Sequence, residues 1–165
     1  MDNSTETRIQ PILEFLARTI GAEFGDMVET VYQGDVGMYP PTAFRDSNGN
    51  YKISVRIVVD GMKDSAMSER SPMGEYRTVT FNIIPMVNMV PHFEATPVTA
   101  YGEVELLEFV DQVYEYFRRT ENIDLGGRAV SSRITSIDFD FEQRGELSIR
   151  AAAIRLEAKL YFENM

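Results

Sequence analysis

The most regular alternation of apolar and polar residues lies in the last third of the chain. From Ile137 to Glu142, apolar and acidic residues take turns, with the period of two that is typical of a half-buried β-strand. After a turn at Gln143–Glu146, a second apolar series runs from Leu147 to Phe162. The pattern predicts a terminal β-hairpin, and we expect the rest of the chain to pack around it.

The second strand of this hairpin changes phase once. Its apolar residues are odd-numbered from Leu147 to Ala153 and even-numbered from Ile154 to Phe162. One extra residue near Ala151–Ala153 would restore a single buried face, so we expect a β-bulge there. The good helix formers in this stretch leave a helix as the alternative. Because period two holds on both sides of the slip, we favour the strand.

Two segments have apolar residues at helical spacing. The first predicts a helix over residues 10–24, with Pro11 tolerated in its first turn, after a loose polar start at residues 1–6. The second predicts a helix over residues 103–119, with acidic residues at its start and Arg118 and Arg119 at its end, as the helix dipole favours. Its expected apolar stripe is Val104, Leu107, Val110, Tyr114 and Phe117, widened by Leu106, Phe109 and Val113.

Short alternating segments between the helices predict further strands, at residues 28–32, 42–45, 51–59 and 77–84. Asn48-Gly49 is a strong signal for a hairpin turn. Pro85 is expected to end the last of these strands or to mark a sheet edge. Residues 61–75 and 86–101 are expected to form extended loops, the second of them a loop or an arm.

Runs of strands between two lone helices indicate an α+β fold. We expect one domain over residues 1–165, with a single antiparallel or mixed β-sheet of about five strands and two α-helices on one face, plus long loops. In this arrangement the second helix packs through Phe109, Val113, Tyr114 and Phe117 onto the sheet face that carries Ile137, Phe139 and Phe141.

Composition narrows the function. The chain has 165 residues, a net charge of −10 and no Cys, so disulfides and thiolate metal sites are excluded. Such an acidic chain is a poor binder of phosphate backbones, and no apolar run approaches a membrane span. His92 is the only histidine and lies in no nucleophile motif. We therefore expect no enzyme activity, cofactor or metal. The alternative is a divalent-cation site at Asp138, Asp140 and Glu142.

Methionine is concentrated in the middle of the chain, where thioether side chains suit adaptable contact surfaces. Met86 and Met89 have packing in the core as an equal alternative. The candidate interaction residues are Met62, Met67, Met73, Met86, Met89 and Phe93.

The order of these segments resembles a known family. The chain has, in order, an opening helix, a hairpin with a long loop, a second helix beginning at Gly102–Val110, and a closing hairpin of Thr135–Phe141 and Leu147–Leu156. This layout is similar to that of the tail terminator proteins of long-tailed bacteriophages, also called tail completion proteins. The resemblance implies a virion protein, assembled in the cytoplasm of a bacterial host, with no catalytic residues. The resemblance further implies that the protein forms a hexameric ring, which caps the tail tube protein and meets the head connector or stopper protein.

Three alternatives stay open beside this resemblance: another neck component such as a head-completion protein, a small metal-dependent enzyme, and a monomeric binding module. For the ring, we expect the loops at Met62–Met73 and Met86–Tyr101 to reach a neighbouring subunit or the tube. Surplus acidic groups are expected to line the lumen, through which DNA passes without specific binding.

Overall fold

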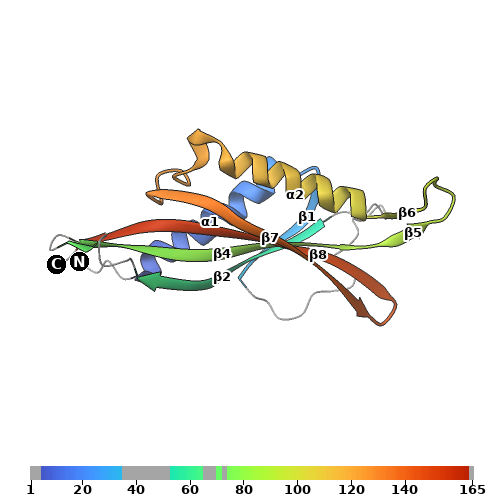
Figure 1. The fold of residues 1–165 in the computed structure, drawn as a ribbon, viewed down its shortest axis with the longest axis horizontal. Helices are drawn as coiled ribbons and strands as arrows, with labels where there is room; N and C mark the ends of the chain where they lie inside the picture. Colours follow the sequence, from blue (N-terminus) through green and yellow to red (C-terminus); the bar gives the residue numbers. More distant parts are fainter. Residues whose placement is uncertain (1–4, 35–52, 65–69, 72–73, 164–165) are drawn as a thin grey trace.

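The fold is a strongly elongated sheet with two helices on one face (Figure 1). The structure is a computed structural model and describes residues 5–34, 53–64, 70–71 and 74–163. The main sheet has the strand order β1-β2-β4-β8-β7, with the short β3 paired to β4. Its strands are β1 (Val28–Gln33), β2 (Ile53–Asp64), β3 (Arg70–Ser71), β4 (Gly74–Asn88), β7 (Ser131–Arg144) and β8 (Leu147–Glu163).

Among the described strands, β1 and β2 pair in parallel and the other neighbours are antiparallel. The sheet is therefore mixed, and the α+β class with helices on one face is confirmed. A separate hairpin of β5 (Val90–His92) and β6 (Thr99–Tyr101) extends beyond the end of β4. We call residues 90–101 the arm.

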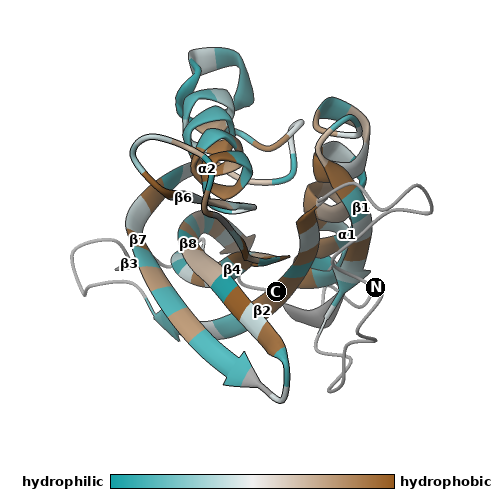
Figure 2. Cartoon of the chain, turned by 90° about the vertical axis from the view of Figure 1, so that its right-hand side faces the viewer, coloured by the Kyte–Doolittle hydropathy of each residue, from teal (hydrophilic) through white to brown (hydrophobic). Residues whose placement is uncertain are grey.

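Two α-helices cover the same side of the sheet (Figure 2). Helix α1 (Thr5–Glu23) lies over β1 and β2, and helix α2 (Glu103–Arg118) lies over β4, β7 and β8, followed by a 3-10 turn η3 (Thr120–Asn122). One contiguous core joins both helices to the sheet, and its largest fully buried side chains include Phe81, Phe109 and Phe117. The helices meet through edge-to-face contacts of Phe24 with Phe109 and Tyr116.

The terminal hairpin is confirmed, but the predicted bulge near Ala151–Ala153 is wrong. The pairing of β4 with β8 keeps one register along its whole length, and the irregularity in the hairpin lies on β7, between Ile134 and Ser136. The phase change in β8 has another cause. Even-numbered residues from Ala152 onward face the helices, whereas Ile149 packs with Met86 in a small cluster on the opposite face. The strand is thus regular and buries a different face at each end.

The two expected loops are largely strands. Strand β2 continues to Asp64 and β4 begins at Gly74, so the expected loop over 61–75 is wrong at both ends. Residues 86–88 complete β4, so a loop from residue 86 is wrong, whereas the alternative of an arm agrees with the projecting β5–β6 hairpin. The described parts of these segments do not alternate, because residues 61–64 of β2 are exposed on both faces and residues 86–88 of β4 are buried on both, whereas strict alternation needs one buried and one solvated face.

Two proline predictions are wrong. Pro85 neither ends β4 nor marks an edge, since β4 lies between β2 and β8 and pairs with Val55 of β2 at this position. The ladder to β8 lapses at Ile84 and Pro85, as expected for a residue with no N–H. Pro11 lies inside α1, because the helix begins at Thr5 within the segment expected to be loose. Its ring is exposed, so water can reach the carbonyl that it leaves unpaired.

The predicted strand at residues 42–45 and the Asn48-Gly49 turn lie outside the described residues. So do Met67 and Met73.

Candidate interaction surfaces

The methionines do not gather into one surface. Met86 is 4% exposed and packs against Ile149, and Met89 is partly buried against the main core. For these two, the packing alternative holds. Met62 is exposed near the far end of β2, and Phe93 is 78% exposed at the tip of the arm. The structure therefore leaves Met62 and Phe93 as surface candidates that lie far apart along the sheet.

A different apolar surface lies on α2 and β7. The core stripe of α2 is Leu106, Phe109, Val110, Val113 and Phe117. The expected stripe members Val104, Leu107 and Tyr114 are exposed instead, and so are Phe139 and Phe141 of β7. The expectation that Tyr114, Phe139 and Phe141 belong to the core is thus wrong, although Phe139 does lie on the helix-covered side, opposite Ala152.

These exposed residues flank the same edge of the sheet. Tyr116 faces α1 through its contact with Phe24. Leu107 and Tyr114 lie nearly on the opposite side of α2 from Tyr116, given about 100° of rotation per residue. That side of α2 adjoins β7, the edge strand. Burial and the nearby Glu23 carboxylate raise the pKa of the Tyr116 phenol.

Arg150 links the helix to the strand at this edge. Its guanidinium lies 3.4 Å from the carboxylate of Glu103 at the start of α2, and it stacks 5.3 Å from the ring centre of Phe139. The N–H of Gly102 donates to the Glu105 carboxylate at 2.9 Å, which caps the helix beside it. The start of α2 is therefore tied to Arg150 of β8, which in turn stacks on Phe139 of β7.

The acidic residues of β7 lie on the other face of the same edge. Asp138, Asp140 and Glu142 oppose Ala153, Ala151 and Ile149, and with Ile84 and Met86 they border a hollow of about 420 Å³. We call Val104, Leu107, Tyr114, Phe139 and Phe141 together with Asp138, Asp140 and Glu142 the β7-edge surface. Its apolar side chains lie on the helix side of the edge strand and its acidic side chains on the opposite face.

Three arginines lie on α1 and in the loop before β7, among the exposed acids Glu14, Glu23 and Asp124. Arg128, in the loop before β7, lies 4.6 Å from the ring centre of Phe15 on α1. Arg18 is exposed on the same helix, where its guanidinium approaches Glu14 at 3.8 Å. Arg8 donates to the Tyr161 carbonyl, and Val130 is 52% exposed nearby. We call Arg8, Phe15, Arg18, Arg128 and Val130 the α1 surface.

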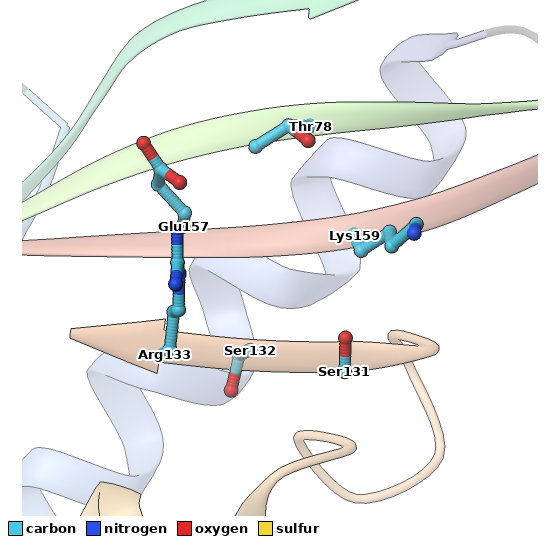
Figure 3. Close-up of a pocket in the computed structure, with 6 residues that line it drawn as sticks. All are labelled: Thr78, Ser131, Ser132, Arg133, Glu157 and Lys159. Atoms are coloured by element: carbon cyan, nitrogen blue, oxygen red, sulfur yellow. The ribbon is translucent and has the colours of Figure 1, made fainter. Parts of the chain in front are cut away.

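A polar hollow of about 280 Å³ crosses β4, β8 and β7 on the face away from the helices (Figure 3). Thr78, Ser131, Ser132, Arg133, Glu157 and Lys159 line it. Arg133 and Glu157 are direct cross-strand neighbours, and Lys159 lies 4.6 Å from the ring centre of Tyr76. Opposite charges on adjacent strands are the ordinary way to stabilise a solvated sheet face.

The described residues offer no arrangement that supports the alternative of a divalent-cation site. Within the described ranges, no three His, Cys, Asp or Glu side chains come close enough together to hold an ion. Asp138, Asp140 and Glu142 follow one another along a single strand face, so their carboxylates are spread along the strand and do not converge on one point.

Sequence reasoning found the residues of β7 but assigned the aromatic ones to the core. It missed the α2 flank because Val104, Leu107 and Tyr114 fall at helical spacing just as the core residues do. The signal for this exposed flank was the width of the apolar stripe on α2, which is wider than packing on one sheet requires.

No protein-family model matches the chain, and a search of curated proteins finds no similar sequence. Among the helices in the described part of the chain, none is long and apolar enough to cross a membrane.

Proposed function

We propose that this protein is a structural component of a long-tailed bacteriophage, a tail terminator whose copies form a ring. The ring caps the tail tube and joins it to the head connector or stopper protein. The proposal rests on the resemblance in layout described above, and on the fold of a sheet with two helices on one face that the resemblance leads one to expect.

The observation that carries the proposal is the β7-edge surface. Val104, Leu107, Phe139 and Phe141 are each more than two-fifths exposed and lie along one edge of the sheet. Grouped apolar side chains with a polar rim are a mark of protein–protein contact. A stable interface buries about 800 Å² on each partner, so in the proposed ring the contact extends beyond these side chains over β7 and the flank of α2.

Charge favours a passage for DNA over a site that holds it. The net charge of −10 repels phosphates, and the solvent side of α2 carries Glu108, Asp111 and Glu115, all exposed. In the proposed ring these carboxylates face the lumen, where they keep passing DNA from binding to the wall.

The test is a particle assembled without this protein. We expect tails of uncontrolled length that carry no heads, and antibody against the protein should label the head-proximal end of finished tails. Labelling of isolated heads at the portal, with tails of normal length in the depleted particles, would contradict a terminator and favour the alternative neck component. Tails and heads that join normally would contradict both.

A further inference from the structure

Strand β7 is an edge of the main sheet, and among the described strands it pairs with β8 alone. On the other side of β8, the Ser148 carbonyl accepts a hydrogen bond from the N–H of Met89 at 2.8 Å. Even-numbered residues of β8 therefore direct their backbone groups toward β4, and odd-numbered ones toward β7. The residues of β7 that oppose even-numbered residues of β8 direct their N–H and C=O groups outward, and they are Ile137, Phe139, Phe141 and Gln143.

A hydrogen bond within β7 agrees with this direction. The N–H of Phe141 donates to the carboxylate of the preceding residue, Asp140, at 2.8 Å, so this donor faces the open edge. Asp140 is exposed, and its carboxylate can yield the donor to an incoming backbone carbonyl. An open edge of this kind is where an extended segment of another protein can add as a further strand.

The two faces of this edge differ in chemistry. Phe139 and Phe141 lie on the helix side and are 41% and 52% exposed. Asp138 and Asp140 are exposed on the opposite face. An added strand places its side chains opposite those of β7, about 5 Å away on the same faces. Its residues would therefore meet phenylalanine rings and carboxylates in turn.

The charge along this edge is negative. Residues 137–147 hold four acidic residues and one basic residue, Arg144. On the acidic face, Arg155 lies 3.2 Å from Asp60 of β2, and Arg56 borders the far side of the hollow. On the helix side, Arg150 lies 3.4 Å from a carboxylate at the start of α2. A segment that carries lysine or arginine is thus attracted to the edge.

We propose that the open edge of β7 binds, as an added β-strand, an extended segment of another protein in which apolar residues alternate with lysine or arginine. The apolar residues of the segment lie against Phe139 and Phe141, and its basic residues lie against Asp138 and Asp140. The inference goes beyond the proposed function, because it concerns the edge of one chain and holds with or without a ring.

A second copy of this chain is not the source of the segment. Two β7 edges paired with each other would set carboxylates against carboxylates, which is repulsive. Strands of this chain that alternate apolar with charged residues, such as β8 over residues 154–160, are already paired on both sides. The described part of the chain therefore offers no segment of the required kind to a neighbour.

The test uses the full chain and a peptide of about nine residues in which lysine and valine alternate, long enough to span residues 137–143. The peptide should bind at least about tenfold more tightly than one of the same composition with its lysines grouped, because only the alternating order matches both faces. In amide hydrogen exchange followed by NMR, the bound peptide should slow exchange most at Ile137, Phe139 and Phe141. Equal binding of the two peptides, or binding without this protection, would contradict the proposal.

Two variants at one position separate the backbone from the side chain. Phe141→Ala keeps the outward N–H and removes the ring, whereas Phe141→Pro removes the N–H as well. Proline is compatible with an edge position whose N–H lies outside the ladder. Phe141→Pro should bind the peptide at least about tenfold more weakly than Phe141→Ala, with circular dichroism as the check on folding. Equal binding by the two folded variants would overturn strand addition.

A charge variant tests the other half of the proposal without touching the backbone. Asp138→Lys with Asp140→Lys should weaken peptide binding at least about tenfold. Asp26→Lys with Glu29→Lys makes the same change in net charge at exposed positions near β1 and should bind like the unchanged chain. Equal effects of the two double variants would contradict a site on β7. A failure of the peptide to bind contradicts this inference alone, since the proposed function is judged by the tails of depleted particles.

Discussion

At the scale of single residues, exposure separates aromatic side chains that the sequence pattern treats alike. Phe109 of α2 is fully buried, whereas Phe139 of β7 is 41% exposed beneath the Arg150 guanidinium. Both fall on apolar positions of a regular period. Periodicity reports which side of an element faces the layer above it, but not whether that layer extends far enough to cover the residue.

This difference gives a paired prediction. Phe109→Ala should lower the free energy of unfolding by about 3–5 kcal/mol, because it leaves a cavity as well as losing transfer energy. Phe139→Ala should cost about 1 kcal/mol or less, since a half-exposed ring leaves no closed cavity. Urea denaturation of the two variants measures both losses. Equal losses would mean that Phe139 is covered in the folded chain.

Gly102 is a second position at which a single added atom, a Cβ, should lower the stability of the fold. Its φ is 97°, and a Cβ added there would lie 2.8 Å from Val87 Cγ2 and 2.9 Å from the Asn88 carbonyl oxygen. Gly127 has a φ of 83° with nothing within 4 Å of the added atom. A substitution by Ala therefore costs backbone strain at both glycines, but only at Gly102 does the added Cβ also clash with its neighbours.

Gly127→Ala should destabilise by about 1–2 kcal/mol, the cost of a left-handed backbone. Gly102→Ala should cost about 2–4 kcal/mol, since overpacking adds to that strain. Thermal unfolding of the two variants provides the comparison. A Gly102→Ala loss no greater than that of Gly127→Ala would show that Val87 and the end of β4 yield freely.

At the scale of elements, helices and strands with a regular apolar period were predictable from the sequence, whereas the ends of strands were not. The helix over residues 103–119 and the terminal hairpin follow from their apolar spacing, and both are confirmed. The ends of β2 and β4 were missed because Gly61 and Pro85 suggest breaks, while neighbouring strands on both sides of β4 hold it extended. The phase change in β8 was misinterpreted because two different structures give the same sequence pattern. A β-bulge produces it, and so does a regular strand that buries one face at one end and the other face at the other end.

The observed bulge on β7 predicts different effects for two single-residue deletions in this strand. Ile134 opposes Leu156 and Ser136 opposes Arg155, so Thr135 is the extra residue. Its removal leaves every other pair in register and should cost about 1 kcal/mol or less.

Deleting Asp138 instead forces a slip that turns the following side chains to the wrong face, and should cost about 3 kcal/mol or more. Chemical denaturation of the two single-residue deletions compares them directly. If the Thr135 deletion is the more damaging one, then the bulge is required for the hairpin to fold.

At the scale of the whole molecule, the account depends on surfaces that one chain leaves uncovered. The sequence supplied the residues of the β7-edge surface but not their exposure, because exposure depends on how far α2 reaches over β7. The arginines of the α1 surface come from α1 and from the loop before β7, which only the folded chain brings together. These two surfaces were therefore not predictable from sequence order.

The most direct test of the account is the mass of the purified protein in native mass spectrometry. One chain has a mass of 18.8 kDa. A closed ring predicts a single dominant species at a whole multiple of this mass, six copies if the resemblance holds, that persists on dilution. A monomer at all concentrations, or an open series of ever longer species with no preferred size, would contradict the ring.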